Sequence, residues 1–182
     1  MPRQSLTEKF SKITFTSDQI QARVRELADQ IVQDYAESDR PLVFITIMSG
    51  AMSFCSDLTR AISDRMHLVQ DFMVVKSYDG QNTTGNVKVL FDHRSNIKDC
   101  DVIVVEDIVD TGLTIKAILN ILEARKPSSI KICTMFEKSE RRLVADLELD
   151  YVGFPIEDYF IVGYGMDEDE AYRHLPFTAM LK

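Results

Sequence analysis

The residues best suited to chemistry lie between Val102 and Leu119, in the stretch VIVVEDIVDTGLTIKAIL. Two acids, Glu106 and Asp107, follow four apolar residues, and a third acid precedes the sequence Thr-Gly-Leu-Thr. Carboxylates accept hydrogen bonds from neighbouring hydroxyls or hold Mg²⁺, and a glycine-containing turn with hydroxyls can hold an anion. The stretch therefore indicates a site for a ribose 5-phosphate, with the diol against the acids and the phosphate in the turn.

Two flanking elements must position this cluster. Residues 102–105 suit a strand buried on both faces, and after Thr114 the apolar residues recur at the spacing of one helix face. A short loop from a strand to a helix offers free backbone N–H groups and the positive end of the helix dipole. The loop lacks the lysine of a Walker P-loop, so a nucleoside triphosphate is a poor candidate. The alternative interpretation is an acidic loop that caps the helix and binds no ligand.

Strands and helices alternate along the rest of the chain. The apolar patterns predict helices at about 17–35 and 52–66, and strands at 42–48, 69–76, 87–91, 130–136, 151–154 and 159–164. We expect loops at 77–86 and in the tail at 168–177. The alternation predicts an α/β fold with a mainly parallel, twisted sheet flanked by helices, and a ligand at the carboxyl ends of the strands.

The composition excludes several classes of protein. With 182 residues, 45% of them hydrophobic and 27% charged, the chain suits one globular domain. The net charge of −8 argues against a general binder of nucleic acid or anionic membranes. No apolar run is long enough for a signal peptide or a membrane span, so we expect a cytoplasmic protein. The cysteines Cys55, Cys100 and Cys133 are expected to be buried free thiols.

The acidic stretch resembles a known motif. Its order is four apolar residues, two acids, two apolar residues and then D-T-G-x-T. This order resembles the phosphoribosyl-pyrophosphate-binding motif of type I phosphoribosyltransferases. Four blocks extend the resemblance to the hypoxanthine-guanine phosphoribosyltransferases: IMSGAMSFCSDL, VVKSYDG, VVEDIVDTGLT and FIVGYGMDEDEAYRHLP. The resemblance implies one domain over residues 1–182, with a core at about 38–150 and a small hood from about 1–37 and 151–182.

The resemblance also implies an activity. In this family a purine base attacks C1 of the ribose in phosphoribosyl pyrophosphate, with Mg²⁺, and pyrophosphate leaves. The expected partners are phosphoribosyl pyrophosphate and a 6-oxopurine, hypoxanthine or guanine, and the expected assembly is a homo-oligomer, a dimer or tetramer. A xanthine-preferring enzyme and a non-catalytic regulator of the same fold are the alternatives.

The family roles transfer to matching positions on both substrates. Asp110 is expected to be the general base. The residues expected around the ribose and its 5-phosphate are Glu106, Asp107, Asp110, Thr111, Gly112, Leu113 and Thr114. The residues expected around the purine are Lys138, which donates to the 6-oxo group, Phe160, which stacks, Ile161, which reads the base edge, and Asp167.

Further roles concern pyrophosphate, metal and a flexible loop. Ser49, Gly50 and Arg173 are expected to bind pyrophosphate, and Ser77 and Tyr78 to open a loop that closes over the site. The expected Mg²⁺ ligands are Glu106, Asp107 and Asp167. Many family members carry a lysine or arginine where this chain has Ser49, and a cis peptide bond between Met48 and Ser49 is a further expectation. Without the family resemblance, we would interpret three residues as ordinary surface charges: Lys138, Asp167 and Arg173. We would interpret Phe160 as an aromatic residue of the core.

Overall fold

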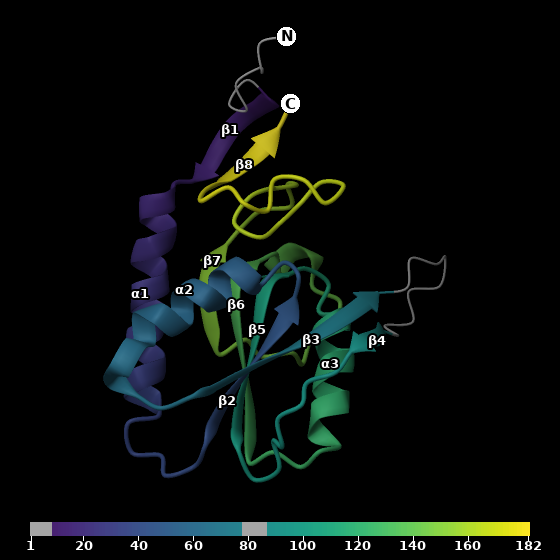
Figure 1. The fold of residues 1–182 in the computed structure, drawn as a ribbon. Coiled ribbons are helices and arrows are strands. Elements are labelled where there is room, and N and C mark those ends of the chain that lie inside the picture. Colours follow the sequence, from purple (N-terminus) through teal and green to yellow (C-terminus); the bar gives the residue numbers. More distant parts are fainter. Residues whose placement is uncertain (1–8, 78–86) are drawn as a thin grey trace.

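A computed structural model describes residues 9–77 and 87–182, which form two sheets with their helices (Figure 1). The main sheet has the strand order β4-β3-β2-β5-β6-β7 and is parallel throughout except for the antiparallel β3–β4 pair. Its strands are β2 (Leu42–Met48), β3 (Val69–Ser77), β4 (Val87–Phe91), β5 (Asp101–Val109), β6 (Ser129–Glu137) and β7 (Tyr151–Pro155). The predicted α/β fold with a mainly parallel sheet is confirmed.

Helices cover both faces of this sheet. The helices α1 (Ser17–Asp34) and α2 (Met52–Ile62) pack on one face, and α3 (Leu113–Glu123) packs on the other (Figure 1). Short 3₁₀ turns lie at η2 (Ser63–Arg65) and η3 (Ser139–Arg141). The first six residues of β2 and of β5 are buried because helices lie on both sides, which explains why most residues in both stretches are apolar. Within the described part of the chain, no helix is long and apolar enough to span a membrane.

The ends of one helix and one strand differ from the prediction. The helix predicted to run to residue 66 ends at Ile62, because Ser63 adopts a positive φ of 53° that interrupts the helical path. The strand that carries the acids continues to Val109 instead of ending near Val105. It continues because its last residues still pair with β6, for instance Ile108 with Phe136. Glu106 and Asp107 therefore lie in a strand and not in the predicted loop.

A smaller layer lies beyond one end of the main sheet. The strands β1 (Phe10–Phe15) and β8 (Thr178–Leu181) pair antiparallel, and the segment between β7 and β8 packs beneath them (Figure 1). Its small core comprises Phe10, Val162, Leu175 and Ala179. Of the segments predicted to form the hood, α1 contacts α2 and β7, and β7 is a strand of the main sheet.

The prediction of a strand at residues 159–164 is wrong. Only isolated bridges occur there, from Val162 to Ala179 and from Gly163 to Met166. Gly163 (φ 97°), Tyr164 (φ 50°) and Gly165 (φ 102°) all have left-handed backbone, which a strand does not allow. From this irregular loop Val162 packs in the small core and Ile161 and Tyr164 pack in the core of the main sheet, whereas Phe160 is exposed.

Candidate active site

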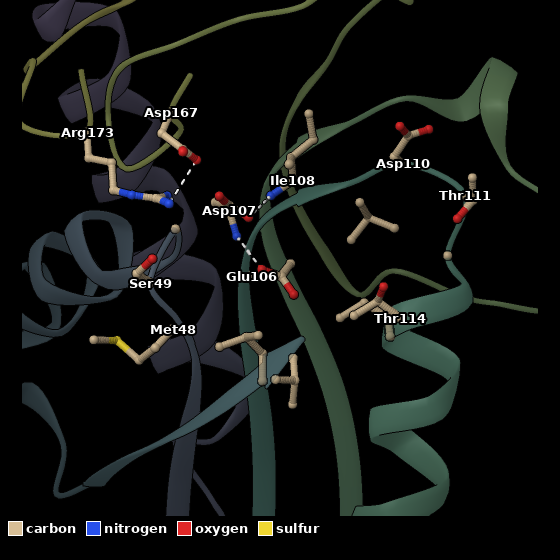
Figure 2. A pocket seen from close by; sticks show the side chains of 16 residues that line it. Met48, Ser49, Glu106, Asp107, Ile108, Asp110, Thr111, Thr114, Asp167 and Arg173 are labelled. Carbon is tan, nitrogen blue, oxygen red and sulfur yellow. Dashed lines mark hydrogen bonds and ion pairs between the residues drawn. The ribbon is translucent and has the colours of Figure 1, made fainter. Parts of the chain in front are cut away.

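The principal cavity lies where β2 and β5 end, at the predicted edge of the sheet (Figure 2). Its volume is about 440 Å³. Its lining combines the turn after β2, the acidic end of β5, the turn before α3 and the tail loop: Ile47, Met48, Ser49, Gly50, Val75, Glu106, Asp107, Ile108, Val109, Asp110, Thr111, Gly112, Thr114, Ile115, Asp167 and Arg173. Of the residues predicted for ribose, phosphate and pyrophosphate, Leu113 is the one outside this lining.

The two acids at the end of β5 lie side by side, with Glu106 buried and Asp107 partly buried. Glu106 is 8% exposed, and its Oε1 accepts a hydrogen bond from the Asp107 N–H (3.2 Å). Asp107 Oδ1 accepts from the Ile108 N–H (2.8 Å) (Figure 2). Burial and the neighbouring Asp107 carboxylate raise the pKa of Glu106 well above its usual range, and burial also raises the pKa of Asp107. This pair therefore favours hydroxyl donors or a cation beside it.

The turn from β5 to α3 is shaped to receive an anion. Gly112 is the N-terminal cap of α3 with φ 82° and makes no side-chain cap hydrogen bond. The Leu113 N–H donates to Thr111 Oγ1 (3.4 Å), and the next N–H groups of the first turn have no partner within the helix, so they can bind a ligand. The positive φ of Gly112 favours glycine, and a Cβ atom there would also lie 2.9 Å from Leu147 Cδ2 and 3.1 Å from Arg142 Cδ. Thr111 and Thr114 place hydroxyl groups on either side of this glycine (Figure 2).

The turn after β2 contacts both the acid pair and the tail. The expected cis peptide bond between Met48 and Ser49 is present. A Cβ atom on Gly50 would lie 1.8 Å from Asp107 Oδ2, and one on Gly165 would lie 1.9 Å from the Gly50 carbonyl oxygen. Glycine at residue 50 leaves room for the Asp107 carboxylate, and glycine at residue 165 lets the tail approach the Gly50 backbone closely.

The tail contributes an ion pair to the same cavity. Arg173 lies 2.9 Å from Asp167 Oδ1 (Figure 2). It also donates to the Gly165 carbonyl (2.8 Å). Arg173 is thereby held at the cavity edge as a cation for an anionic ligand. Within residues 9–77 and 87–182, no three His, Cys, Asp or Glu side chains gather closely enough to hold a metal ion alone. Mg²⁺ needs only one or two carboxylates when phosphate oxygens complete its shell, and the acid pair fits that requirement.

A second cavity of about 220 Å³ adjoins the first. Lys138 is 7% exposed and Phe160 59% exposed, so the cavity combines a buried ammonium with an open aromatic face. The lining residues are Asp107, Ile108, Asp110, Lys138, Tyr159, Phe160, Ile161, Met166 and Asp167. The two cavities share Asp107, Ile108, Asp110 and Asp167. Asp110 therefore stands at the boundary between them.

Several residues at the site were not predicted from the sequence. Tyr159 and Met166 line the second cavity, and Arg141 and Asp158 form ion pairs with predicted site residues. No local pattern marked the last two, because their partners lie elsewhere in the chain. Ser77 ends β3, whereas the predicted loop residue Tyr78 lies outside the described residues.

Comparison with known proteins shows which family this chain resembles. The family model described as "Phosphoribosyl transferase domain" matches residues 16–169. The hypoxanthine-guanine phosphoribosyltransferase of Streptococcus thermophilus is 42% identical, over 97% of this chain and 96% of the relative. The hypoxanthine-guanine-xanthine phosphoribosyltransferase of Tritrichomonas foetus is 37% identical, over 100% of this chain and 97% of the relative. A hypoxanthine phosphoribosyltransferase structure from Staphylococcus aureus has a TM-score of 0.91 and 41% identity, covering 99% of this chain and 96% of that one.

Proposed function

Because the chain belongs to the phosphoribosyltransferase family, we infer that it transfers the 5-phosphoribosyl group of phosphoribosyl pyrophosphate to hypoxanthine and guanine, giving IMP and GMP. It is a glycosyltransferase of purine salvage. The observation that carries this function is the pair of adjoining cavities, one polar and one with an open aromatic ring, which share Asp110 at their boundary. A sugar phosphate in the first and a purine in the second would react there.

The larger cavity suits the phosphoribosyl donor. The open N–H groups of α3, with Thr111 and Thr114, bind the 5-phosphate. Glu106 and Asp107 accept hydrogen bonds from the ribose hydroxyls. These bonds offset the energetic cost of burying two adjacent carboxylates. The pyrophosphate lies against the backbone of the turn after β2, where Arg173 supplies the positive charge that Ser49 does not.

Mg²⁺ is the cofactor of this proposal. Glu106 and Asp107 would hold it from the ribose side and Asp167 from the tail. When bound, the ion offsets the charge that develops on the departing pyrophosphate.

Asp110 acts as the general base. A purine nitrogen forms a bond to C1 of the ribose while the bond from C1 to the pyrophosphate oxygen breaks. The Asp110 carboxylate takes the proton from the ring nitrogen opposite the attacking one, which raises the electron density at the attacking atom. Its place between the cavities puts the carboxylate beside both reactants.

The smaller cavity selects 6-oxopurines. The Lys138 ammonium can only donate, so it pairs with the 6-oxo group of hypoxanthine or guanine and is left unpaired by the 6-amino group of adenine. Phe160 stacks on the base with its exposed ring, and the Ile161 backbone reads the base edge. A site that depends on such a bond rejects the wrong analogue strongly.

The assay offers hypoxanthine, guanine, xanthine and adenine separately with phosphoribosyl pyrophosphate and Mg²⁺, beside the variant Asp110→Asn. We expect the first two bases to react, adenine to fail, and the variant to be slower by roughly a hundredfold. Turnover of adenine at a comparable rate would contradict the role of Lys138, and full activity of the variant would contradict the role of Asp110. Measurement with xanthine tests whether the chain shares the third base named for the Tritrichomonas relative.

We also propose a homo-oligomer, a dimer or tetramer, in the cytoplasm. The net charge of −8 supports a protein that does not engage nucleic acid or anionic membranes. Light scattering after gel filtration gives the mass of the assembly, and a mass near 20.8 kDa would contradict the proposal.

A further inference from the structure

Four alternating charges form a continuous chain beside the purine cavity. Lys138 Nζ lies 3.1 Å from Asp158 Oδ1, and the same oxygen lies 3.3 Å from a terminal nitrogen of Arg141. The Nε atom of Arg141 lies 3.1 Å from Asp110 Oδ1. We call Lys138, Asp158, Arg141 and Asp110 the charge chain.

The charge chain joins the ends of three neighbouring strands. Asp110 directly follows β5, Lys138 directly follows β6, and Asp158 lies three residues beyond the end of β7. Arg141 closes η3, the turn that starts after Lys138. The Lys138 N–H also donates to the Val109 carbonyl (2.9 Å), so the backbone ties β5 to this turn as well.

Only the ends of the charge chain face the ligand space. Asp110 and Lys138 line the purine cavity, whereas Arg141 and Asp158 are absent from the lining of both described cavities. The two middle members are thus placed to act through their neighbours and not on a ligand directly.

Each end of the charge chain depends on its neighbour. The Lys138 side chain is 9% exposed, and a buried ammonium needs an opposite charge, which Asp158 supplies. The hydrogen bond from Lys138, with the charge of Arg141, lowers the pKa of Asp158 and so keeps it ionised. At the other end, Asp110 Oδ1 is buried and Arg141 is the cation facing it. This contact leaves Oδ2 as the oxygen for the proton.

We propose that Arg141 and Asp158 are positioning residues that hold the base Asp110 and the purine donor Lys138 at a fixed separation. The proposal rests on the function given above. It predicts different kinetic effects at the two ends. Lys138 binds the base before and during reaction, so loosening it weakens binding, whereas Asp110 takes a proton only as the reaction proceeds, so loosening it slows turnover.

The test compares Asp158→Asn with Arg141→Gln in steady-state kinetics with hypoxanthine. We expect Asp158→Asn to raise the KM for hypoxanthine by about fivefold and to leave kcat within about twofold, the size expected for a half-exposed ion pair. We expect Arg141→Gln to lower kcat by about fivefold and to leave that KM within about twofold.

Conservative variants separate positioning from general stability. Arg141→Lys keeps the charge but loses the planar fork that spans two carboxylates, so it should recover part of the lost kcat. The matched control is Arg65→Gln, which breaks a partly exposed ion pair with Asp29 in a contact remote from both cavities. This control should change neither kinetic constant, and thermal unfolding of every variant shows whether the fold is intact.

Equal changes of KM and kcat in both variants, or no change in either, would overturn the proposal. A second measurement does not need turnover. In calorimetry with IMP, Asp158→Asn should bind about fivefold more weakly, and Arg141→Gln within about twofold of the unaltered chain. Equal IMP affinities for all three proteins would also overturn it. Turnover of hypoxanthine by the unaltered chain tests the proposed function separately, so the two failures can be told apart.

Discussion

Gly50 lies directly against the carboxylate of Asp107, with 1.8 Å between Asp107 Oδ2 and the position that a Cβ atom of residue 50 would take. The turn after β2 therefore touches the acid pair with no side chain between them. Because Gly165 meets the Gly50 carbonyl from the other side, three segments converge at one point. This convergence sets the distance between the turn after β2 and the acid pair in the larger cavity.

Replacing Gly50 with alanine should disrupt that convergence. The added methyl group forces Asp107 or the turn to move, and overpacking of this kind costs about 1–3 kcal/mol of stability. Displaced ligand groups should raise the KM for phosphoribosyl pyrophosphate by about tenfold or more. The measurement is that KM, together with thermal unfolding. Ser53→Ala, in the first turn of α2 and outside the lining of both cavities described above, serves as the control. An unchanged KM in Gly50→Ala would refute this account of the site.

Replacing Phe160 with alanine should weaken purine binding with little effect on stability. The ring is 59% exposed, so its removal should shift the unfolding temperature by less than about 2 °C. Stacking of a base on an aromatic ring contributes about 1–3 kcal/mol, so the KM for hypoxanthine should rise by about tenfold. Leu143→Ala removes another exposed apolar side chain, 66% exposed, and should leave the KM unchanged. Equal effects of the two variants would contradict a stacking role.

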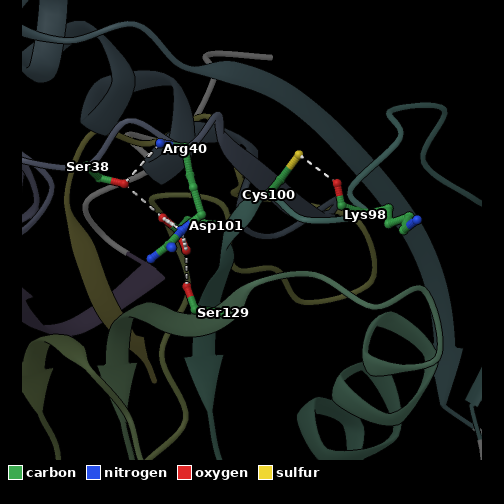
Figure 3. A network of polar contacts seen from close by, with 6 residues as sticks. All are labelled: Ser38, Arg40, Lys98, Cys100, Asp101 and Ser129. Atoms are coloured by element: carbon green, nitrogen blue, oxygen red, sulfur yellow. Dashed lines mark hydrogen bonds and ion pairs between the residues drawn. The ribbon is translucent and has the colours of Figure 1, made fainter.

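Asp101 should stabilise the fold in a pH-dependent way. It accepts hydrogen bonds from Ser129, Arg40 and Ser38 at the start of β5, far along the strand from the acids (Figure 3). Burial by itself would raise the pKa of Asp101, but these hydrogen bonds outweigh burial and lower it. A lowered folded-state pKa means that the stabilisation is complete above the unfolded pKa of about 4 and is lost as the pH falls through the folded pKa.

Thermal unfolding of Asp101→Asn tests this dependence. At pH 7 we expect a loss of about 2 kcal/mol, or about 5 °C, because hydrogen bonds to a charged acceptor are lost. Below a pH of about 4 the difference from the unaltered chain should narrow, since its carboxylate is being protonated as well. The kcat should not change, because Asp101 lies at the opposite end of β5 from the cavities. A difference that is constant from pH 7 to pH 3 would contradict this assignment.

The thiols of Cys55 and Cys133 should react slowly in the folded protein. All three cysteines are free and buried, and burial raises the pKa of both Cys55 and Cys133. The thiolate is the reactive form, so a raised pKa and a lack of access both slow the reaction. Titration with a chromogenic disulfide should proceed rapidly for all three thiols only after denaturation. Rapid reaction of Cys133 in the native protein would contradict its burial.

The strands of the main sheet were predictable from sequence because each has a local pattern of apolar residues. The bounds of β2 and β4 match the prediction, and β3 and β7 differ by one residue at the end. The turn before α3 was also predictable, since its glycine and hydroxyl residues are adjacent in the chain. The pairing of β1 with β8 was not, because their residues lie far apart in sequence and neither strand is strongly patterned.

The wrong prediction of a strand at residues 159–164 shows what a pattern of apolar residues cannot predict. Residues 159–162 form a short apolar run that is typical of a strand, but positive φ angles at Gly163 and Gly165 bend the chain. An apolar run predicts burial and does not determine the backbone path of the segment. The same bend brings Gly165 to Gly50, a contact that no local pattern contains.

The sequence by itself determined the α/β fold, the acidic stretch and the family, because these depend on residue types at short spacing. The tertiary structure alone decided that Asp110 stands between two cavities and that Arg141 and Asp158 link it to Lys138. Ion pairs among the ends of different strands depend on strand order and register. Both arise only when the sheet has assembled, because hydrogen bonds between strands and burial by helices fix which ends lie side by side.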